Sequence, residues 1–428
     1  MSADESAGYQ HTRLLAWVVW GLGALFFALS FFHRVAPAVM VDDLMRDFAV
    51  GGAVLGNLAA LYFYAYAGLQ LPVGMVLDRW GPRRVLSAAA ALCALGTLLF
   101  ATAAGLGSAY AGRFLIGAGA AFPFIGSLTL ATLWFPPRRF ALLTGLTMFA
   151  GMAGAILGQA PLATLVEAVG WRAAMAGAAA VALLICVLVW LVVRDRPEGA
   201  AAQAPAHPGP EKATMLAGLR EVLGRRQSWV IACFAACMAG PMFAFAGLWG
   251  VPYLMRAHHL ERPTAALMAS AMMVGWALGA PAAGWLSDHL GRRRAPMIGG
   301  AVVALLAMVT LLYVPQVTLA GSVALLFLNG FAGGSMSVCF ATAREHSPRH
   351  ATGVAIAFVN MINIGAGALY QPLIGLFLDL NWDGTMAAGA RLYSEAAFQT
   401  ALGVLPASYA VAVVLGLLTR ETWCRPID

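Results

Sequence analysis

Two arginines, Arg34 and Arg113, lie inside long apolar stretches of the sequence. Arg34 stands seven residues past the middle of the run 14–40, and Arg113 stands eight residues before the middle of the run 108–134. If these runs are helices that cross a membrane in opposite directions, a rise of 1.5 Å per residue places both guanidinium groups at nearly the same depth. A charge inside a membrane is costly, and it marks a functional residue by default.

Arginine binds carboxylate or phosphate groups through two parallel N–H bonds. Neither Asp nor Glu lies at a comparable depth in the sequence, so the two arginines predict a positive pocket for an anion. His33 precedes Arg34, and because histidine titrates near neutral pH it is the candidate proton carrier. Several alternatives stay open: Arg34 could reach the headgroups or pair with Asp42 or Asp43, Arg113 could be structural or serve proton movement, and His33 could be a solvated interfacial residue.

Other polar and aromatic residues within the apolar runs are candidates to contact the same substrate. Asn360 and Asn363 share a helix face at a spacing of three residues, and Trp249 and Tyr253 follow glycine and proline breaks of the kind that mark gating segments. Bridging between helices is the alternative for the amides, and anchoring at the lipid interface is the alternative for the aromatic residues. The remaining candidates are Tyr62, Tyr66, Gln159 and Asn329.

A short polar stretch occurs twice, at residues 74–84 and 284–294, and each copy separates two apolar runs. The simplest explanation is a duplicated helical bundle, and duplicated bundles in membranes are usually transporters. An aspartate at such a position can accept hydrogen bonds from the free N–H groups of a neighbouring helix. The alternative is that these charges only set the topology. Candidates for conformational control are Gly74, Asp78, Arg79, Gly81, Arg83, Gly284, Asp288, Gly291 and Arg293.

The composition requires a membrane. Hydrophobic residues make up 61% of the chain and charged residues 11%, whereas soluble domains average about 25% charged residues. At about 20 residues per span, the chain has room for twelve spans, and each must be helical because lipid offers the backbone no hydrogen bonds. The apolar runs are 14–40, 51–76, 85–104, 108–134, 140–168, 172–194, 228–255, 263–286, 295–314, 318–343, 351–379 and 396–419.

The sequence therefore predicts an all-α membrane protein with twelve transmembrane helices in two pseudo-symmetric six-helix bundles. The bundles are expected at 1–194 and 228–428, and the polar segment 195–227 is expected to be a cytoplasmic linker whose basic end forms a short amphipathic helix on the membrane. Of the 26 lysines and arginines, 19 fall on the side of the termini and five on the other side. This asymmetry predicts a multi-pass protein of the cell (inner) membrane with both termini cytoplasmic.

The excess of basic residues is explained by topology, so no nucleic-acid partner is expected. The six cysteines form no CxxC pair and have no histidine at metal-ligand spacing, so neither a metal nor another cofactor is predicted. A sequence of the Walker A type is also missing from the chain, which argues against direct use of ATP. An enzyme is not expected, since no Ser-His-Asp set, paired carboxylates or metal cluster occurs at membrane depth.

The repeated hinge and the segment Arg113-Phe114-Leu115-Ile116-Gly117-Ala118-Gly119 resemble signatures of the major facilitator superfamily, and the resemblance covers essentially the whole chain. It implies two domains around a cavity lined by helices 1 and 4, a latch at Asp78 that holds the outward-facing state, and a protein that works as a monomer. Arginines in helices 1 and 4 are similar to the anion–cation symporter and organophosphate branches. The chain departs from these because helix 7 has no arginine and helices 1 and 4 have no acidic residue.

These features together predict a secondary active transporter that moves a small organic anion by alternating access, coupled to protons. The expected partners are that anion, protons and membrane lipid. One alternative is multidrug or metabolite efflux by proton antiport, which the glycines of helix 5 favour. The other alternative is a membrane sensor that has kept the transporter fold but carries out no flux.

Overall fold

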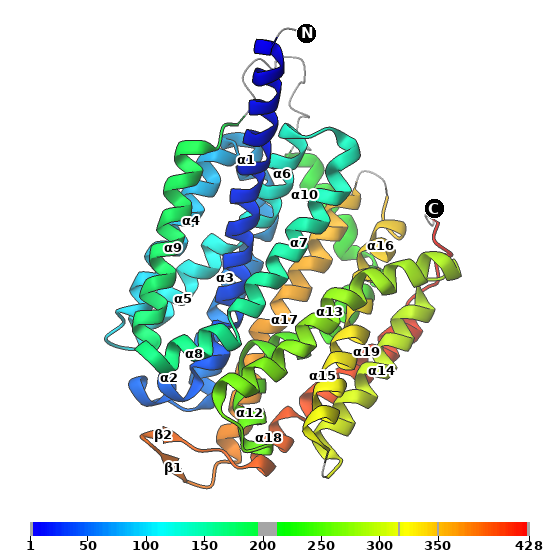
Figure 1. Ribbon diagram of the computed structural model, residues 1–428. Helices are drawn as coiled ribbons and strands as arrows, with labels where there is room; N and C mark the ends of the chain where they lie inside the picture. The colour runs from blue at the N-terminus through cyan, green and yellow to red at the C-terminus, as the bar shows by residue number, and fades with distance from the viewer. Residues whose placement is uncertain (1–2, 196–211, 316, 349–350, 426–428) are drawn as a thin grey trace.

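Figure 1 shows the computed structural model of the chain, which describes residues 3–195, 212–315, 317–348 and 351–425. Within these residues, twelve helical spans are long and apolar enough to cross a membrane. The prediction of an all-α membrane protein is therefore confirmed. In the first half, the elements that form the spans are α1 (Ala3–Val35), η1 (Ala36–Val39), α3 (Gly52–Trp80), α4 (Pro82–Ala101), α5 (Leu106–Ala120), α6 (Pro123–Trp134), α7 (Phe140–Leu157), α8 (Ala160–Val169) and α9 (Trp171–Val192).

The second half repeats this order after α10 (Lys212–Gly224), which forms the end of the predicted linker. Residues 196–211 of that linker lie outside the described residues, and the membrane-surface position of α10 stays a prediction. The elements of the second set of spans are α11 (Arg226–Ala244), η3 (Phe245–Trp249), α12 (Gly250–Ala257), α13 (Arg262–Leu290), α14 (Arg294–Tyr313), α15 (Leu319–Gly333), η4 (Gly334–Ser337), α16 (Val338–Glu345), α17 (Thr352–Leu380), α18 (Glu395–Leu402) and α19 (Val404–Leu418).

Several spans are broken where the sequence removes a backbone donor. Pro123 begins α6 and Pro161 lies in the first turn of α8, where the missing N–H would have no helical partner in any case. In the seventh span, Pro241 lies inside α11, and the five residues of η3 that follow it form a π-helix. Such bulges are frequent at functional sites, and residues of both bundles donate hydrogen bonds to carbonyls in and just before this one.

The duplication is visible in how the helices approach one another. Gly117 of α5 lies against the backbone of Tyr62 in α3, and a Cβ atom at position 117 would collide with it. Gly330 of α15 lies in the same way against the backbone of Met272 in α13. These glycines stand at matching places in the two halves, so the same close packing of the fourth span on the second recurs in each bundle.

The two bundles meet at one end of the molecule, here called the hairpin end, which carries α2 (Val41–Phe48) and the antiparallel pair β1 (Met386–Ala387) and β2 (Ala390–Arg391) (Figure 1). Asp379, at the end of α17, accepts hydrogen bonds from the first two N–H groups of α3, those of Gly52 and Ala53, at 2.9 Å each. An ion pair of 2.7 Å joins Arg262 to Asp43 across the same end. Helix α3 and helix α17 are thereby locked together.

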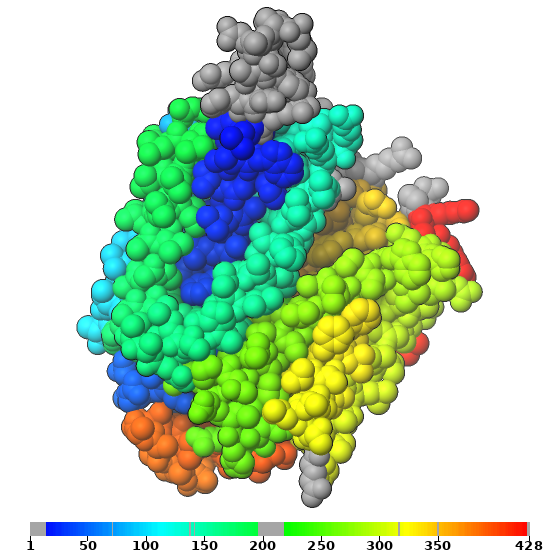
Figure 2. Space-filling view, in the orientation of Figure 1, coloured from blue at the N-terminus to red at the C-terminus, as the bar shows by residue number. Residues whose placement is uncertain are grey.

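The opposite end, here called the linker end, carries the two hinge copies and the segment that joins the halves. In Figure 2 the surface is hollowed between α7 and α13 toward this end, and α17 is visible in the recess. The molecule is thus closed at the hairpin end and open at the linker end.

Candidate functional site

Arg34 lies in the last turn of α1, close to the closed hairpin end. Only 5% of its surface is exposed. Its Cζ atom lies 4.2 Å from the ring centre of Phe31, 5.2 Å from that of Tyr66, 5.6 Å from that of Phe243 and 5.7 Å from that of Tyr62. These rings come from α1, α3 and α11, so both bundles contribute to an aromatic cage around one guanidinium group, where cation–π attraction partly offsets the lost hydration.

One edge of the Arg34 guanidinium has no hydrogen-bond partner among the described residues. Its Nε and Nη2 atoms are buried and have no hydrogen-bond partner among the described residues. In this structure the buried side chain does not reach the surface, and among the described residues Arg34 forms no ion pair with Asp42 or with Asp43, which pairs with Arg46 and Arg262. A buried cation without a partner costs several kcal/mol. This edge is therefore suited to a bidentate carboxylate or a similar oxyanion.

Arg113 is held differently, although it lies at the depth that the sequence predicts, beside the same turn of α1. It is 1% exposed, and it donates from Nη1 to the His33 carbonyl at 2.9 Å and from Nη2 to the Ala59 carbonyl at 3.2 Å. Its Cζ atom lies 5.4 Å from the ring centre of Tyr62. Because carbonyl groups occupy both Nη atoms, Arg113 ties α5 to α1 and α3 in this conformation.

The side chain of His33 is fully buried and extends toward α4. Its Nε2 atom lies 3.3 Å from the Thr97 hydroxyl, and its Nδ1 atom has no hydrogen-bond partner within the described residues. The imidazole therefore sits behind the cage rather than in it. A role in proton coupling stays a prediction.

Two glutamines hold the π-helical break of the seventh span from opposite sides. Gln159 of the first bundle donates to the Ala246 carbonyl at 2.7 Å, and Gln371 of the second bundle donates to the Phe243 carbonyl at 2.9 Å. Trp249 is fully buried and donates to the Gln371 carbonyl at 2.9 Å. The structure thus brings Gln159 of the first bundle into contact with η3, and Trp249, the last residue of η3, into contact with α17.

The other predicted contacts divide into two groups. Asn360 donates to Gln70 at 2.9 Å across the α3–α17 contact, and the Oδ1 atom of Asn363 is buried without a partner in the described chain. In contrast, Tyr253 donates to the Leu311 carbonyl at 3.2 Å, and Asn329 donates to the Ala304 carbonyl at 2.8 Å. Tyr253 and Asn329 therefore pack against α14 within the second bundle, and the structure does not bring them to Arg34.

The first hinge copy is largely free at the linker end. Asp78 and Arg79 are exposed, and Gly74 has open space where a Cβ atom would stand. Gly81 has a φ of 78° and lies against the Asp195 carboxylate, which also accepts a hydrogen bond of 2.8 Å from the backbone N–H of Arg83. This loop is therefore tied to the end of its own sixth span.

The second hinge copy is held by ion pairs. Arg293 binds Asp288 at 2.6 Å and the buried Glu345 of α16 at 2.7 Å. Gly291 closes α13 with a φ of 61°, and Gly284 has open space around it. As in the first half, a carboxylate after the last span, here Glu421, accepts the backbone N–H of Arg293 at 2.7 Å.

Sequence reasoning found Arg34, Tyr62 and Tyr66, but it missed the other two rings of the cage and the whole hairpin-end lock. Phe31 and Phe243 give no signal in an apolar sequence, whereas Asp379 and Arg262 had one, since they are charged residues at the ends of long apolar runs. The space beside Arg34 has a volume of about 10 Å³. It is lined by Phe31, Arg34, Val35, Met152, Ala155, Met242, Phe243, Gly247 and Met273.

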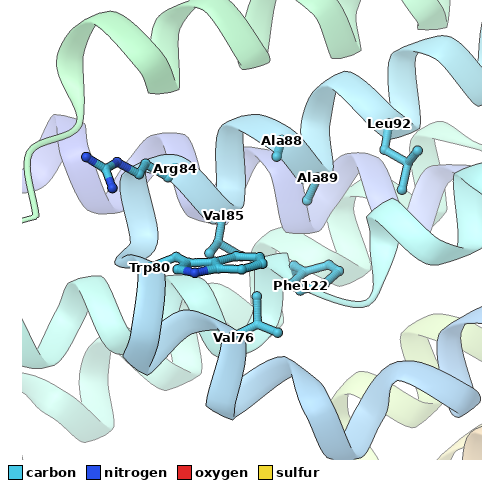
Figure 3. Close-up of a pocket in the computed structure, with 8 residues that line it drawn as sticks. All are labelled: Val76, Trp80, Arg84, Val85, Ala88, Ala89, Leu92 and Phe122. Carbon is cyan, nitrogen blue, oxygen red and sulfur yellow. The ribbon is translucent and has the colours of Figure 1, made fainter.

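A larger cavity, of about 580 Å³, lies between α3 and α4 near the linker end. Figure 3 shows Val76, Trp80 and Phe122 close together in it, while Arg84 points away from them. Arg84 is the one charged residue among those that line this cavity, and it is exposed. Size alone does not make a binding site, and the buried, unpaired edge that could bind a ligand belongs to Arg34.

Comparison with known proteins gives a consistent result. The model of the Major Facilitator Superfamily matches residues 20–370 and 237–421. A membrane sensor protein of Escherichia coli (strain K12) is 25% identical over 93% of this chain and 91% of that protein. A probable galactarate/D-glucarate transporter of Escherichia coli (strain K12) is 22% identical over 88% of this chain and 89% of that protein.

Among solved structures, a bacterial homologue of the human lysosomal transporter Spinster, in an inward-facing and unoccupied conformation, has a TM-score of 0.77. It is 17% identical, and the match covers 95% of this chain and 97% of that one, which shows the shared fold. The chain spans only about two fifths of the length of some other curated relatives.

Proposed function

Because the chain belongs to the major facilitator superfamily, we propose that it is a secondary transporter that moves a small organic anion by alternating access, with Arg34 as the residue that binds the anion. The observation that carries the proposal is the unpaired Nε–Nη2 edge of a buried arginine in a cage to which both bundles contribute. A relative named for sugar diacids supports an anionic substrate.

In this proposal, residues 1–194 and 228–428 are the two moving domains and 195–227 connects them. The linker end, with both termini, faces the cytoplasm of a cell whose inner membrane holds the protein. This conformation then faces inward, and transport requires that the lock at Asp379 opens while the linker end closes over the substrate. Proton coupling, with His33 as carrier, belongs to the proposal, and the protein acts as a monomer.

The test is anion binding to detergent-purified protein, measured by thermal shift and calorimetry. A ligand at about 100 times its Kd stabilises the folded state by roughly 2.7 kcal/mol, which is visible as a shift in Tm. Arg34→Ala should lose this shift, and Arg34→Lys should weaken binding about tenfold or more because lysine has no bidentate fork. Arg46→Ala, at the exposed surface of the hairpin end, is the matched control and should bind normally. Equal binding by Arg34→Ala would overturn the proposal.

A membrane sensor is the second candidate, because a relative so named matches nearly the whole chain. Purified protein in liposomes separates the two functions. A transporter accumulates or exchanges the labelled anion, whereas a sensor binds it with the same dependence on Arg34 and shows no flux.

A further inference from the structure

The proposed anion site has one free cation, although the sequence placed two arginines at this depth. Arg113 gives both Nη atoms to backbone carbonyls, and its Nε atom is buried beside them. Arg34 alone has a complete fork edge without partners in the described chain. The site therefore offers one complete two-N–H edge, that of Arg34, and a second carboxylate would find no equivalent edge to bind.

The space beside Arg34 has a lining that is apolar apart from the arginine itself. Of the nine residues that line the space beside it, Arg34 is the only one with a polar side chain. Beyond this lining, the cage contains two tyrosine hydroxyls, and that of Tyr62 donates to the Ser30 carbonyl at 2.9 Å. A ligand hydroxyl placed in this space would lose its hydrogen bonds to water without gaining a protein partner. Each such hydroxyl should weaken binding roughly tenfold to a hundredfold.

The unpaired polar atom that borders the site, Oε1 of Gln371, is a hydrogen-bond acceptor and cannot bind a second carboxylate. Gln371 uses its amide N–H on Phe243, and its Oε1 atom is buried without a partner among the described residues. A Cβ atom at Gly247, which lines the space, would lie 3.2 Å from the Gln371 amide nitrogen, so this side chain borders the site. An amide oxygen is an acceptor, and it repels a carboxylate that faces it.

The apolar part of the wall can adapt. Met152, Met242 and Met273 line the space from α7, α11 and α13, and therefore from both bundles. The space holds about 10 Å³, room for roughly one water molecule, so a ligand must displace these side chains. Methionine is unbranched and flexible, and its sulphur packs well against aromatic rings.

From these observations we infer that the substrate is a monoanion whose single carboxylate or sulfonate binds Arg34 and whose body is apolar, and most favourably aromatic. Polyhydroxylated diacids are disfavoured by the same site. This inference rests on the proposed function, and it distinguishes this chain from the relative that is named for galactarate and D-glucarate.

The test compares benzoate and phenylacetate with D-glucarate and tartrate, and with uncharged benzamide, by calorimetry on the purified full-length chain. The aromatic monoanions should bind roughly a hundredfold more tightly than the hydroxylated diacids, and benzamide should not bind. Arg34→Ala should bind none of them. Met152→Gln adds hydrogen-bonding groups to the wall and should narrow the difference in affinity between the aromatic monoanions and the hydroxylated diacids.

The outcomes separate the two claims. Glucarate or tartrate binding as tightly as benzoate, with loss in Arg34→Ala, would overturn the substrate class and leave the anion site intact. Binding of benzoate that survives in Arg34→Ala, or binding of benzamide in its place, would overturn both.

Discussion

The two copies of the hinge share two glycines, an aspartate and two arginines, with His289 in place of Arg79, yet the structure uses the shared residues differently. In the second copy, the buried Arg293 pairs both with the exposed Asp288 and with the buried Glu345 of its own bundle. In the first copy, the aligned Arg83 lies 4.6 Å from the ring centre of Trp190 and donates to its carbonyl, and Asp78 is exposed. The cause is local, because α16 ends with Glu345 whereas α6 contains no acidic residue.

The contacts of each hinge therefore depend on the residues packed against it, such as Glu345, and not on the repeated motif alone. The second copy is fixed inside one bundle whatever the other bundle does. The first copy keeps its carboxylate available, as expected of a latch that engages the opposite bundle only when the linker end closes. At the hairpin end, Asp379 already makes this kind of contact with the first N–H groups of α3.

The largest expected effect concerns stability of the second hinge. Glu345→Gln leaves Arg293 buried with one anionic partner fewer, and this should lower the free energy of unfolding by about 3 kcal/mol. Arg79→Ala, in the exposed first hinge, should change it by less than about 0.5 kcal/mol. Thermal and denaturant unfolding in detergent measure both. If both variants lowered the free energy of unfolding by similar amounts, the second hinge would not be more firmly held than the first.

A smaller effect is expected when the first hinge copy is changed, and it concerns the rate of transport. Asp78→Asn should slow turnover about tenfold, since a carboxylate at a helix N-terminus contributes roughly 1 kcal/mol or somewhat more. Substrate affinity should not change, because Asp78 lies far from Arg34. Asp288→Asn is the matched variant and should slow turnover by no more than about threefold. Flux in liposomes provides the measurement, and equal slowing by both variants would argue against a latch at Asp78.

The smallest effect is a pH dependence at the linker end of the second bundle. Burial alone would raise the pKa of Glu421, but backbone N–H groups, those of Arg293 and Arg294 first among them, hold the pKa of this carboxyl below its usual range. Its contribution to stability is therefore complete above the unfolded pKa, near 4.5, and is lost as the pH falls through the lower folded value.

Unfolding measured between pH 6 and pH 3 should consequently show a loss of stability that Glu421→Gln reduces. The variant of the first bundle that corresponds to Glu421→Gln is Asp195→Asn, because the Asp195 carboxylate accepts the backbone N–H of Arg83. A pH profile that Glu421→Gln leaves unchanged would show that the carboxyl does not clamp the hinge.

The sequence predicted much of this architecture because lipid restricts the possibilities. Apolar runs of about 20 residues had to be helices, and counting residues placed Arg34 and Arg113 at one depth, where the structure finds both beside Tyr62. The predicted span 396–419 is divided into α18 and α19 by a break at Gly403, three residues before Pro406, which the count of apolar residues alone did not reveal.

The site was less predictable, because depth along a helix does not give direction around it. Asn329 and Tyr253 lie at plausible depths but face α14. Arg113 differs from Arg34 only in that two carbonyl groups, belonging to His33 and Ala59, reach its nitrogens. Such contacts depend on how three helices pack together, and the spacing of residues in one sequence does not predict that packing.

The carboxylates of Asp195 and Glu421 have a consequence for the history of the chain. Each ties the loop between the second and third spans of its bundle to the end of the sixth span, so each half is fastened to itself before it meets the other. A gene that encoded one such half could be copied whole and joined to itself without new contacts being needed to hold either copy in shape. What then had to evolve was the interface between the two copies, and at that interface the two halves now differ.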